Sequence, residues 1–262
     1  MPYADLHELR LHYRLDGNWQ NGNDAPVLVL GHALGVSHAM WAPQREALTA
    51  RFRVLSCDGR GHGDSTVTPG PYTVAQLGQD VLDLTDALGI RRFHFCGLSM
   101  GGLVGQWLAS QAPMHVDRLV LASTAVRFGP RETFDARIAS VLAEGMQPLV
   151  EGILARWFTA PYRIAEPSQV EHVRALLQAC TPAGYAANCA AVRDADLRES
   201  LARITAPTLV ISGSADPGAT PEQGRELARG IAGARFVELP AAHLSNVEAA
   251  IAFNAAVLEH LA

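Results

Sequence analysis

A serine at position 99 lies in a pattern that can make its hydroxyl a nucleophile. Residues Phe95–Gly101 read F-C-G-L-S-M-G, which contains G-x-S-x-G between an apolar β-type segment and a helical one. A sharp strand-to-helix turn of this kind strains the serine backbone, and only glycine fits at the flanking positions. The turn also frees the Met100 amide to donate to an oxyanion. We therefore predict that Ser99 is a nucleophile; the alternative is an inert serine in a tight turn.

Two further residues can activate this serine. A serine hydroxyl needs a base to accept its proton, and His243 lies in the loop between the last apolar strand and the final helix. An acid could follow the strand Arg118–Ala122 or the strand Thr208–Ser212, and only the second is followed by a carboxylate, Asp216. The order serine, acid, histidine is the one that such strand-to-helix serine sites use. The alternatives are a structural histidine and a plain Asx-turn.

A glycine-bounded loop, Gly31–Gly35, follows the first strand of the expected parallel sheet. We expect the Leu34 amide to be the second oxyanion donor, together with Met100. His32 either contacts the substrate or shapes this loop through its ring nitrogens.

A second polar, glycine-rich segment, Asp58–Ser65, is interpreted as a structural loop in which Asp58 pairs with Arg60. His32, His62 and His243 could converge at one mouth, but no H-x-H or H-E-x-x-H spacing occurs. We therefore expect no metal site and no cofactor.

Short apolar runs alternate with amphipathic helical stretches, which indicates an α/β fold with a mostly parallel sheet and helices on both faces. An antiparallel edge strand is expected at His7–Leu15. The predicted parallel strands are Val27–Leu30, Arg53–Cys57, Arg92–Cys96, Arg118–Ala122, Thr208–Ser212 and Arg235–Leu239.

The helices are marked by their ends. Thr73 precedes one helix that Gly89 ends, and Thr220 with Pro221 starts another. Between residues 124 and 196 helical periodicity continues without a credible strand, as in Ile138–Leu142, Leu149–Trp157 and Val170–Ala179. We interpret residues 124–196 as an inserted helical cap on a core formed by residues 1–123 and 197–262. Such a cap would enclose the crevice at the strand carboxyl ends.

Composition narrows the class of protein. Of the 262 residues 48% are hydrophobic and 18% are charged, which predicts a large buried core. The net charge is -5, which does not suit binding to nucleic acid. The first 14 residues lack the blocks of a signal peptide, and no apolar run is long enough for a membrane span. Four cysteines without metal spacing are interpreted as reduced packing thiols. We expect a cytoplasmic enzyme for a small molecule, with its oligomeric state, including a homo-oligomer, left open.

Together these motifs resemble the α/β-hydrolase superfamily and, within it, the 3-oxoadipate enol-lactonase family of the β-ketoadipate pathway of aromatic catabolism. The resemblance covers almost the whole chain, and its more particular blocks are Gly70–Thr73, Arg156–Thr159 and Arg193–Arg198. It departs at the oxyanion loop, where the family has asparagine, serine, leucine and glycine and this chain has His32–Gly35. A cap tryptophan of the family is Phe134 here.

The resemblance implies hydrolysis of a carboxylic ester or lactone, most specifically of 3-oxoadipate enol-lactone, through an acyl-enzyme on Ser99. It also implies that the cap supplies substrate-binding residues, among them Phe134 and Trp157. A lactone that carries a carboxylate needs a cation in an apolar pocket. Arg127, Arg131 and Arg137 begin the cap, and we favour Arg137; the alternative is that all three are solvated charges.

Three other functions remain in view. A broad carboxylesterase or a cofactor-free perhydrolase would use the same residues, and the His32 loop would suit either. A ligand-binding protein could use the fold without turnover, although the complete set of Ser99, Asp216 and His243 weighs against it. A haloalkane dehalogenase is excluded because its nucleophile is a carboxylate.

Overall fold

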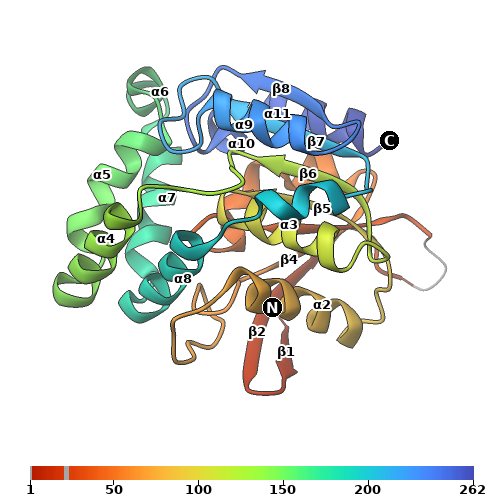
Figure 1. Ribbon diagram of the computed structural model, residues 1–262, viewed down its shortest axis with the longest axis horizontal. Coiled ribbons are helices and arrows are strands. Elements are labelled where there is room, and N and C mark those ends of the chain that lie inside the picture. Colours follow the sequence, from red (N-terminus) through yellow and green to blue (C-terminus); the bar gives the residue numbers. More distant parts are fainter. Residues whose placement is uncertain (1, 21–23) are drawn as a thin grey trace.

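A computed structural model of the protein, which describes residues 2–20 and 24–262, is built on one eight-stranded sheet (Figure 1). The strand order is β1-β2-β4-β3-β5-β6-β7-β8, and every neighbouring pair from β4 to β8 is parallel. The strands are β1 (Tyr3–Leu6), β2 (Leu9–Asp16), β3 (Val27–Gly31), β4 (Arg53–Cys57), β5 (Phe93–Leu98), β6 (Val116–Ala122), β7 (Thr208–Gly213) and β8 (Arg235–Leu239). The α/β fold expected from the sequence is confirmed.

The N-terminal edge differs from the expectation. The predicted edge strand, His7–Leu15, is β2, but it lies between β4 and the additional strand β1, which forms the true edge. A turn at His7, with φ of 42°, joins the two strands. Only Leu6 is buried in β1, so Tyr3–Leu6 lacks the alternation that would have revealed a strand.

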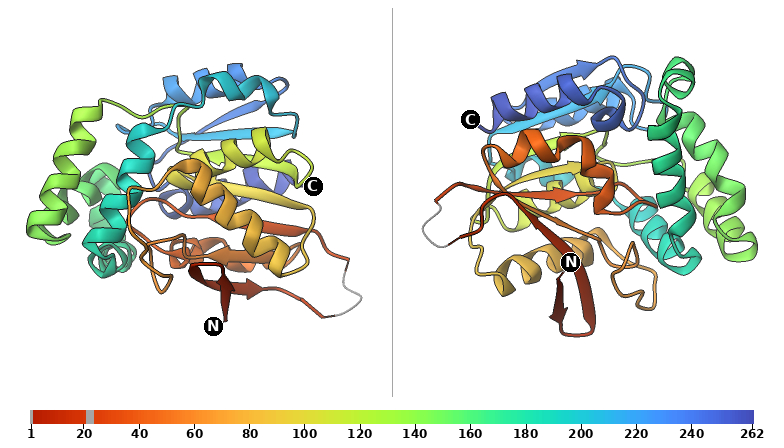
Figure 2. Two further views of the ribbon diagram at one scale, coloured as in Figure 1. Left: turned by 60° about the horizontal axis from the view of Figure 1, so that its bottom comes forward. Right: turned by 180° about the vertical axis from the view of Figure 1, so that it is seen from behind.

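Helices cover both faces of the sheet, and the central strands have apolar residues on both sides to contact them. The strands β5 and β7 are buried at every position, which is typical of parallel strands under two helix layers. One layer contains α2 (Val74–Ala87), α3 (Met100–Gln111), η2 (Arg198–Arg203) and α9 (Pro221–Gly230). The other, nearer the viewer in the right panel of Figure 2, contains η1 (His38–Gln44), α1 (Arg45–Thr49), α10 (Ser245–Glu248) and α11 (Ala250–His260).

The predicted helix signals are present. Thr73 accepts a hydrogen bond from the Gln76 amide at the start of α2, and Gly89 follows that helix with φ of 69°. Thr220 and Gln223 form a complete capping box at the start of α9.

Five helices form the inserted cap at one end of the sheet, at the left of Figure 1. They are α4 (Arg131–Glu144), α5 (Gln147–Trp157), α6 (Ala160–Ala165), α7 (Pro167–Ala179) and α8 (Pro182–Asp194). No strand interrupts them, and α4 packs along α8. The sequence patterns indicated α4, α5 and α7 but not α6 and α8, although a threonine cap and a proline in the first turn begin both of the latter, as Thr159 with Pro161 and Thr181 with Pro182.

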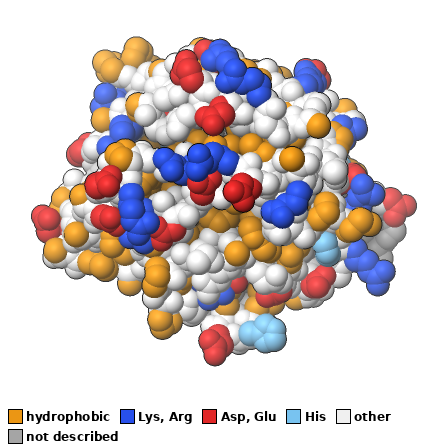
Figure 3. Space-filling model, in the orientation of Figure 1, with side chains coloured by type: hydrophobic (Ala, Val, Ile, Leu, Met, Phe, Trp, Pro, Cys, Tyr) orange, Lys and Arg blue, Asp and Glu red, His pale blue; other side chains and the backbone are white. Residues whose placement is uncertain are grey.

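The surface carries charges of both signs. On the face shown in Figure 3, arginines and acidic residues alternate without a continuous basic area. Across the described ranges, no helix combines the length and the apolar character that crossing a membrane requires.

Candidate active site

Ser99 lies in a strained turn between β5 and α3. Its φ of 57° and ψ of -111° place it in a region that side chains rarely adopt. A Cβ at Gly97 would lie 2.1 Å from the Gly101 carbonyl oxygen, and a Cβ at Gly101 would lie 2.2 Å from that of Gly31. Both glycines therefore let the helix start directly against the neighbouring strand, as the sequence predicted.

Asp216 and His243 meet across the ends of β7 and β8. His243 Nδ1 lies 2.7 Å from Asp216 Oδ2, and both side chains are buried. Asp216 Oδ1 accepts hydrogen bonds from the amides of Gly218, at 2.8 Å, and Ala219, at 3.0 Å. An Asp carboxylate held in this way accepts the Nδ1 proton of the imidazole, which leaves Nε2 as the basic nitrogen.

A cavity of about 240 Å³ lies between the sheet and the cap. Ser99, Asp216 and His243 line its floor, together with Leu34. The cap lines the opposite side with Phe134, Arg137, Ile153, Arg156, Trp157, Tyr185 and Val192. The Trp157 ring faces the His243 ring at 6.0 Å between centroids and 28° between planes. The structure therefore brings the three sequence-predicted catalytic candidates, and the predicted Phe134, Trp157 and Arg137, into one cavity.

Two backbone amides beside Ser99 are free. Within residues 2–20 and 24–262, neither the Leu34 nor the Met100 amide donates a hydrogen bond to another residue. Their neighbours are engaged: Gly35 donates to His62 Nε2 at 2.9 Å, and Gly101 donates to the His32 carbonyl at 3.1 Å. Two amides left free next to a candidate nucleophile are the donors that an oxyanion hole requires.

His32 faces away from this cavity, so the expectation that it binds substrate is not supported. Its Nε2 accepts the Gly59 amide at 2.8 Å, and its Nδ1 lies 2.8 Å from the Ala33 carbonyl. Its ring contacts the His62 ring, with centroids 4.8 Å apart. His32 and His62 thus brace the loop that contains Leu34, and burial lowers the pKa of His62 to about 3, which keeps it a neutral acceptor.

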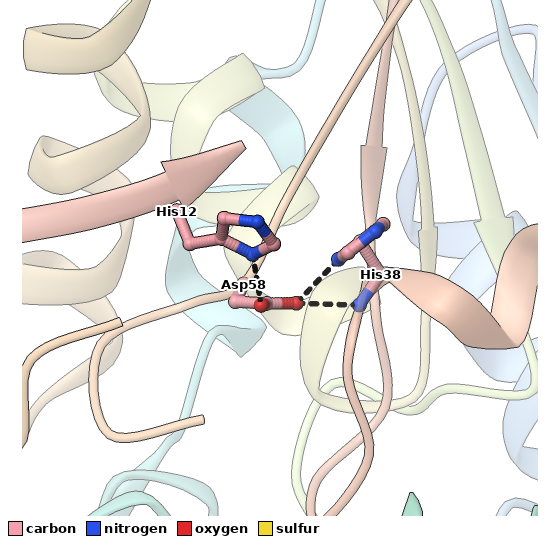
Figure 4. Close-up of side chains that lie close together, drawn as sticks. All are labelled: His12, His38 and Asp58. Atoms are coloured by element: carbon pink, nitrogen blue, oxygen red, sulfur yellow. Dashed lines mark hydrogen bonds and ion pairs between the residues drawn. The ribbon is translucent and has the colours of Figure 1, made fainter. Parts of the chain in front are cut away.

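The predicted pairing of Asp58 with Arg60 is wrong. Arg60 forms a two-pronged ion pair with Asp80 of α2, at 2.6 and 2.8 Å, because it points toward that helix. Asp58 instead lies between two histidines, with His12 Nδ1 and His38 Nδ1 each 2.7 Å from one of its oxygens (Figure 4).

The His12–Asp58–His38 group is the one candidate for metal binding in the described part of the chain. The carboxylate of Asp58 also accepts the backbone amides of His38, at 2.8 Å, and Asp64, at 3.1 Å. Its oxygens therefore receive four N–H donors, and a ring nitrogen that donates a proton offers no lone pair to a metal. The donor set fits a buried structural carboxylate, which joins β2, η1 and the loop after β4.

The three candidate cap arginines differ. Arg131 pairs with Asp194, at 2.5 Å, and Arg127 is exposed and lines no part of the cavity. Arg137 lines the cavity, with its guanidinium 5.3 Å from the Phe134 ring centroid.

Sequence reasoning missed a second arginine and a tyrosine in the cavity. Arg156 lines it from α5, and its pKa is lowered by burial and by the charge of Arg137. Within the residues described, neither arginine forms an ion pair with an acidic side chain. Burial raises the pKa of Tyr185 to about 12, so its hydroxyl stays protonated beside Arg137. The block Arg156–Thr159 was the available signal for Arg156.

The four cysteines are free and buried. Burial raises the pKa of Cys57 to about 12 and that of Cys189 to about 11, so these thiols are unreactive packing groups.

Comparison with known proteins agrees with this geometry. The sequence profile of the alpha/beta hydrolase fold matches residues 26–151. The 3-oxoadipate enol-lactonase 2 of Acinetobacter baylyi is 39% identical over 89% of this chain and 88% of its own. The crystal structure of an enol-lactonase from Burkholderia xenovorans superposes with a TM-score of 0.97 and 48% identity, covering 99% of both chains. A hydrolase from Pseudomonas aeruginosa has a TM-score of 0.95 and 50% identity, over 99% of this chain and 97% of its own.

Proposed function

This chain belongs to the α/β-hydrolase family as an enol-lactonase-like hydrolase, and from that premise we propose that it opens 3-oxoadipate enol-lactone to 3-oxoadipate. The observation that supports this choice of substrate is the cavity, in which two arginines without an acidic partner lie opposite Ser99. Such an arrangement suits an ester that carries a carboxylate.

The reaction is a double displacement. His243 Nε2 accepts the Ser99 proton while Oγ attacks the lactone carbonyl, and the amides of Leu34 and Met100 stabilise the oxyanion. The ring C–O bond then breaks, and the enolate oxygen takes the proton from His243 to give an enol, which becomes the ketone. Water, deprotonated by His243, attacks the acyl-enzyme and releases the second carboxylate, and Ser99 regains its proton. Asp216 holds the imidazole in the required tautomer throughout.

The cap binds the carboxylate of the substrate. Burying that charge is costly unless cations meet it, and Arg137 and Arg156 provide two guanidinium groups at the cavity wall. Burial and the charge of Arg137 lower the pKa of Arg156, and an anion between the two guanidinium groups offsets their repulsion. Phe134 and Trp157 add apolar walls around the lactone ring.

The test compares two substrates on the purified protein. We expect kcat/KM for the enol-lactone to exceed that for phenyl acetate by at least about a hundredfold, because only the lactone engages the arginines. Equal values would favour the broad carboxylesterase. A single slow turnover of either ester, followed by no steady state, would favour a ligand-binding protein. Ser99→Ala controls for background hydrolysis.

We also propose a cytoplasmic location and a small-molecule substrate. Four free, buried cysteines suit a reducing compartment, and a cavity of about 240 Å³ suits a small molecule.

A further inference from the structure

Glu248, the last residue of α10, bridges two loops that are far apart in the sequence. Its Oε2 accepts the Ala242 amide at 2.8 Å, and both oxygens accept the Thr159 amide at 3.3 Å. The Thr159 hydroxyl donates to Oε1 as well. Ala242 precedes His243, and Thr159 lies two residues after Trp157 at the start of α6. The carboxylate thus links the base loop to the cap.

This carboxylate has no cationic partner. No ion pair includes Glu248 among the residues that the structure describes, and its side chain is only partly accessible. Its oxygens are occupied by N–H and O–H donors from the two loops, and hydrogen bonds to an ionised acceptor are stronger than neutral ones. In a glutamine at this position one acceptor oxygen becomes an NH2 group, so the Thr159 hydroxyl would have to reverse from donor to acceptor, and the negative charge that strengthens these hydrogen bonds would be lost. The site therefore favours an ionised carboxylate.

The contacts around His243 show what the bridge controls. On one side of His243, the Ala242 amide is held by Glu248; on the other, the Leu244 amide donates to the Trp157 carbonyl at 3.1 Å. The imidazole itself lies between Asp216 and the Trp157 ring. Backbone amides on both sides of His243 are therefore linked to the cap segment Trp157–Thr159, one through Glu248 and one directly.

We propose that Glu248 is a positioning residue that locks the His243 loop to the cap and so directs the imidazole toward Ser99. The inference rests on the proposed role of His243. It makes the cap part of the catalytic geometry as well as the wall of the cavity. A displacement of about 1 Å in a catalytic group costs as much as a hundredfold in rate, so a carboxylate that touches no substrate can control turnover.

The test uses Glu248→Gln, which keeps the shape of the side chain and replaces one acceptor oxygen. We expect kcat to fall about tenfold or more on both the enol-lactone and phenyl acetate, with KM within about threefold of wild type, because the base is misplaced and the arginines are not. Glu259→Gln is the matched control: it removes an exposed carboxylate paired with Arg235 and should leave both constants unchanged.

Thr159 provides a second, independent test. Thr159→Val removes the hydroxyl, whereas Thr159→Ser keeps it, so we expect kcat to fall in the first variant and to return in the second. The double variant Glu248→Gln with Thr159→Val should be little slower than Glu248→Gln alone, because both changes break one bridge. If Glu248→Gln fails to fold in thermal unfolding, the Thr159 pair decides the question.

Two results would overturn the proposal. One is a folded Glu248→Gln protein whose kcat stays within about twofold of wild type. The other is a rise in KM for the lactone alone, which would restrict Glu248 to cap packing. Wild-type protein that cleaves phenyl acetate but not the lactone would refute the proposed substrate, and the phenyl acetate data would still decide the role of Glu248.

Discussion

Ser99, Asp216 and His243 follow the carboxyl ends of β5, β7 and β8, and each is held in place by different contacts. Ser99 is held in a strained backbone conformation between two glycines, and Asp216 is held by two amides from its own turn. His243 is held by Asp216 and by the cap. A fault in any one of these should stop the whole reaction.

Substitution of the three residues should therefore give similar losses. We expect Ser99→Ala, His243→Ala and Asp216→Asn each to lower kcat by about a thousandfold or more, because such residues act as a unit. Steady-state hydrolysis of phenyl acetate measures the loss without involving the arginines. A double variant should be little slower than Ser99→Ala. Near wild-type turnover in Asp216→Asn would show that the acid lies elsewhere.

The two cavity arginines should contribute unequally to kcat/KM for the anionic substrate. Arg137→Ala should cost the enol-lactone about 2 to 4 kcal/mol in kcat/KM, since a buried carboxylate loses a charge-assisted bond. Arg156 is more exposed, and solvent screens its charge, so Arg156→Ala should cost about 1 kcal/mol or less. Kinetics with both substrates measures these values, and phenyl acetate should change by no more than a few-fold.

Arg131→Ala is the matched control for this pair. Arg131 is a cap arginine whose charge pairs with Asp194 outside the cavity, so its loss should leave both substrates unaffected. Equal losses on lactone and aryl ester for Arg137→Ala would instead indicate a packing role.

At the scale of the elements, the loop after β4 holds the loop after β3 in position. Four hydrogen bonds join them: Gly35 donates to His62, Gly59 donates to His32, and both the amide and the ring Nδ1 of His38 lie within hydrogen-bond distance of Asp58. In this way the polar segment Asp58–Ser65 fixes the backbone that presents the Leu34 amide. His62 in this segment and His32 in the loop after β3 are structural acceptors, and each must stay neutral to accept an N–H.

This requirement predicts a pH dependence of stability. Burial lowers the pKa of His62 to about 3, whereas the unfolded chain titrates near its ordinary value of about 6.5. Between these values the unfolded state binds more protons, so the stability from this group is complete above about pH 6.5 and falls as the pH drops toward 3. Between these two pH values, the loss of this proton site lowers the free energy of unfolding by up to about 1.4 kcal/mol for each pH unit.

Urea unfolding at pH values from 7 to 4 tests this contribution. In His62→Gln the free energy of unfolding should fall less steeply with decreasing pH than in the wild type, although it should be lower at pH 7. The remaining slope would come from other buried histidines, such as His32 and His94, whose pKa values burial also lowers. Parallel slopes for the two proteins would contradict a neutral, buried His62.

At the scale of the whole molecule, the cap and the sheet share one continuous hydrophobic core. The same cluster of buried side chains includes Phe134, Val150 and Leu177 of the cap and Leu34 and Phe95 of the sheet domain. Hydrogen bonds through Glu248 and Trp157 reinforce this contact.

We expect the cap and the core to unfold together. Hydrogen exchange measured by mass spectrometry in increasing urea should show peptides from α5 and α7 losing protection at the same urea concentration as peptides from β5 and β7. Loss of protection in the cap at clearly lower urea would mean that residues 124–196 form a separately stable or more mobile domain.

The sequence by itself determined the residues whose signals are local. A strand, a turn and a helix leave short-range patterns, and these predicted Ser99 with its two glycines, the loops of Asp216 and His243, and the strands from Val27 onward. The inserted helices were visible because strand patterns stop there. The prediction missed an element that lacks such a pattern, namely β1, in which only Leu6 is buried.

Only the tertiary structure decided which side chains meet. Asp58 and Arg60 have opposite charges two residues apart, yet Asp58 binds His12, 46 residues away, and Arg60 binds Asp80. Local sequence patterns could not predict three other features for the same reason: the direction of the His32 ring, the place of Arg156 in the cavity, and the bridge that Glu248 forms. A partner is chosen by the packing of distant elements and by the free energy of leaving a buried charge unpaired, and neither quantity is written in neighbouring residues.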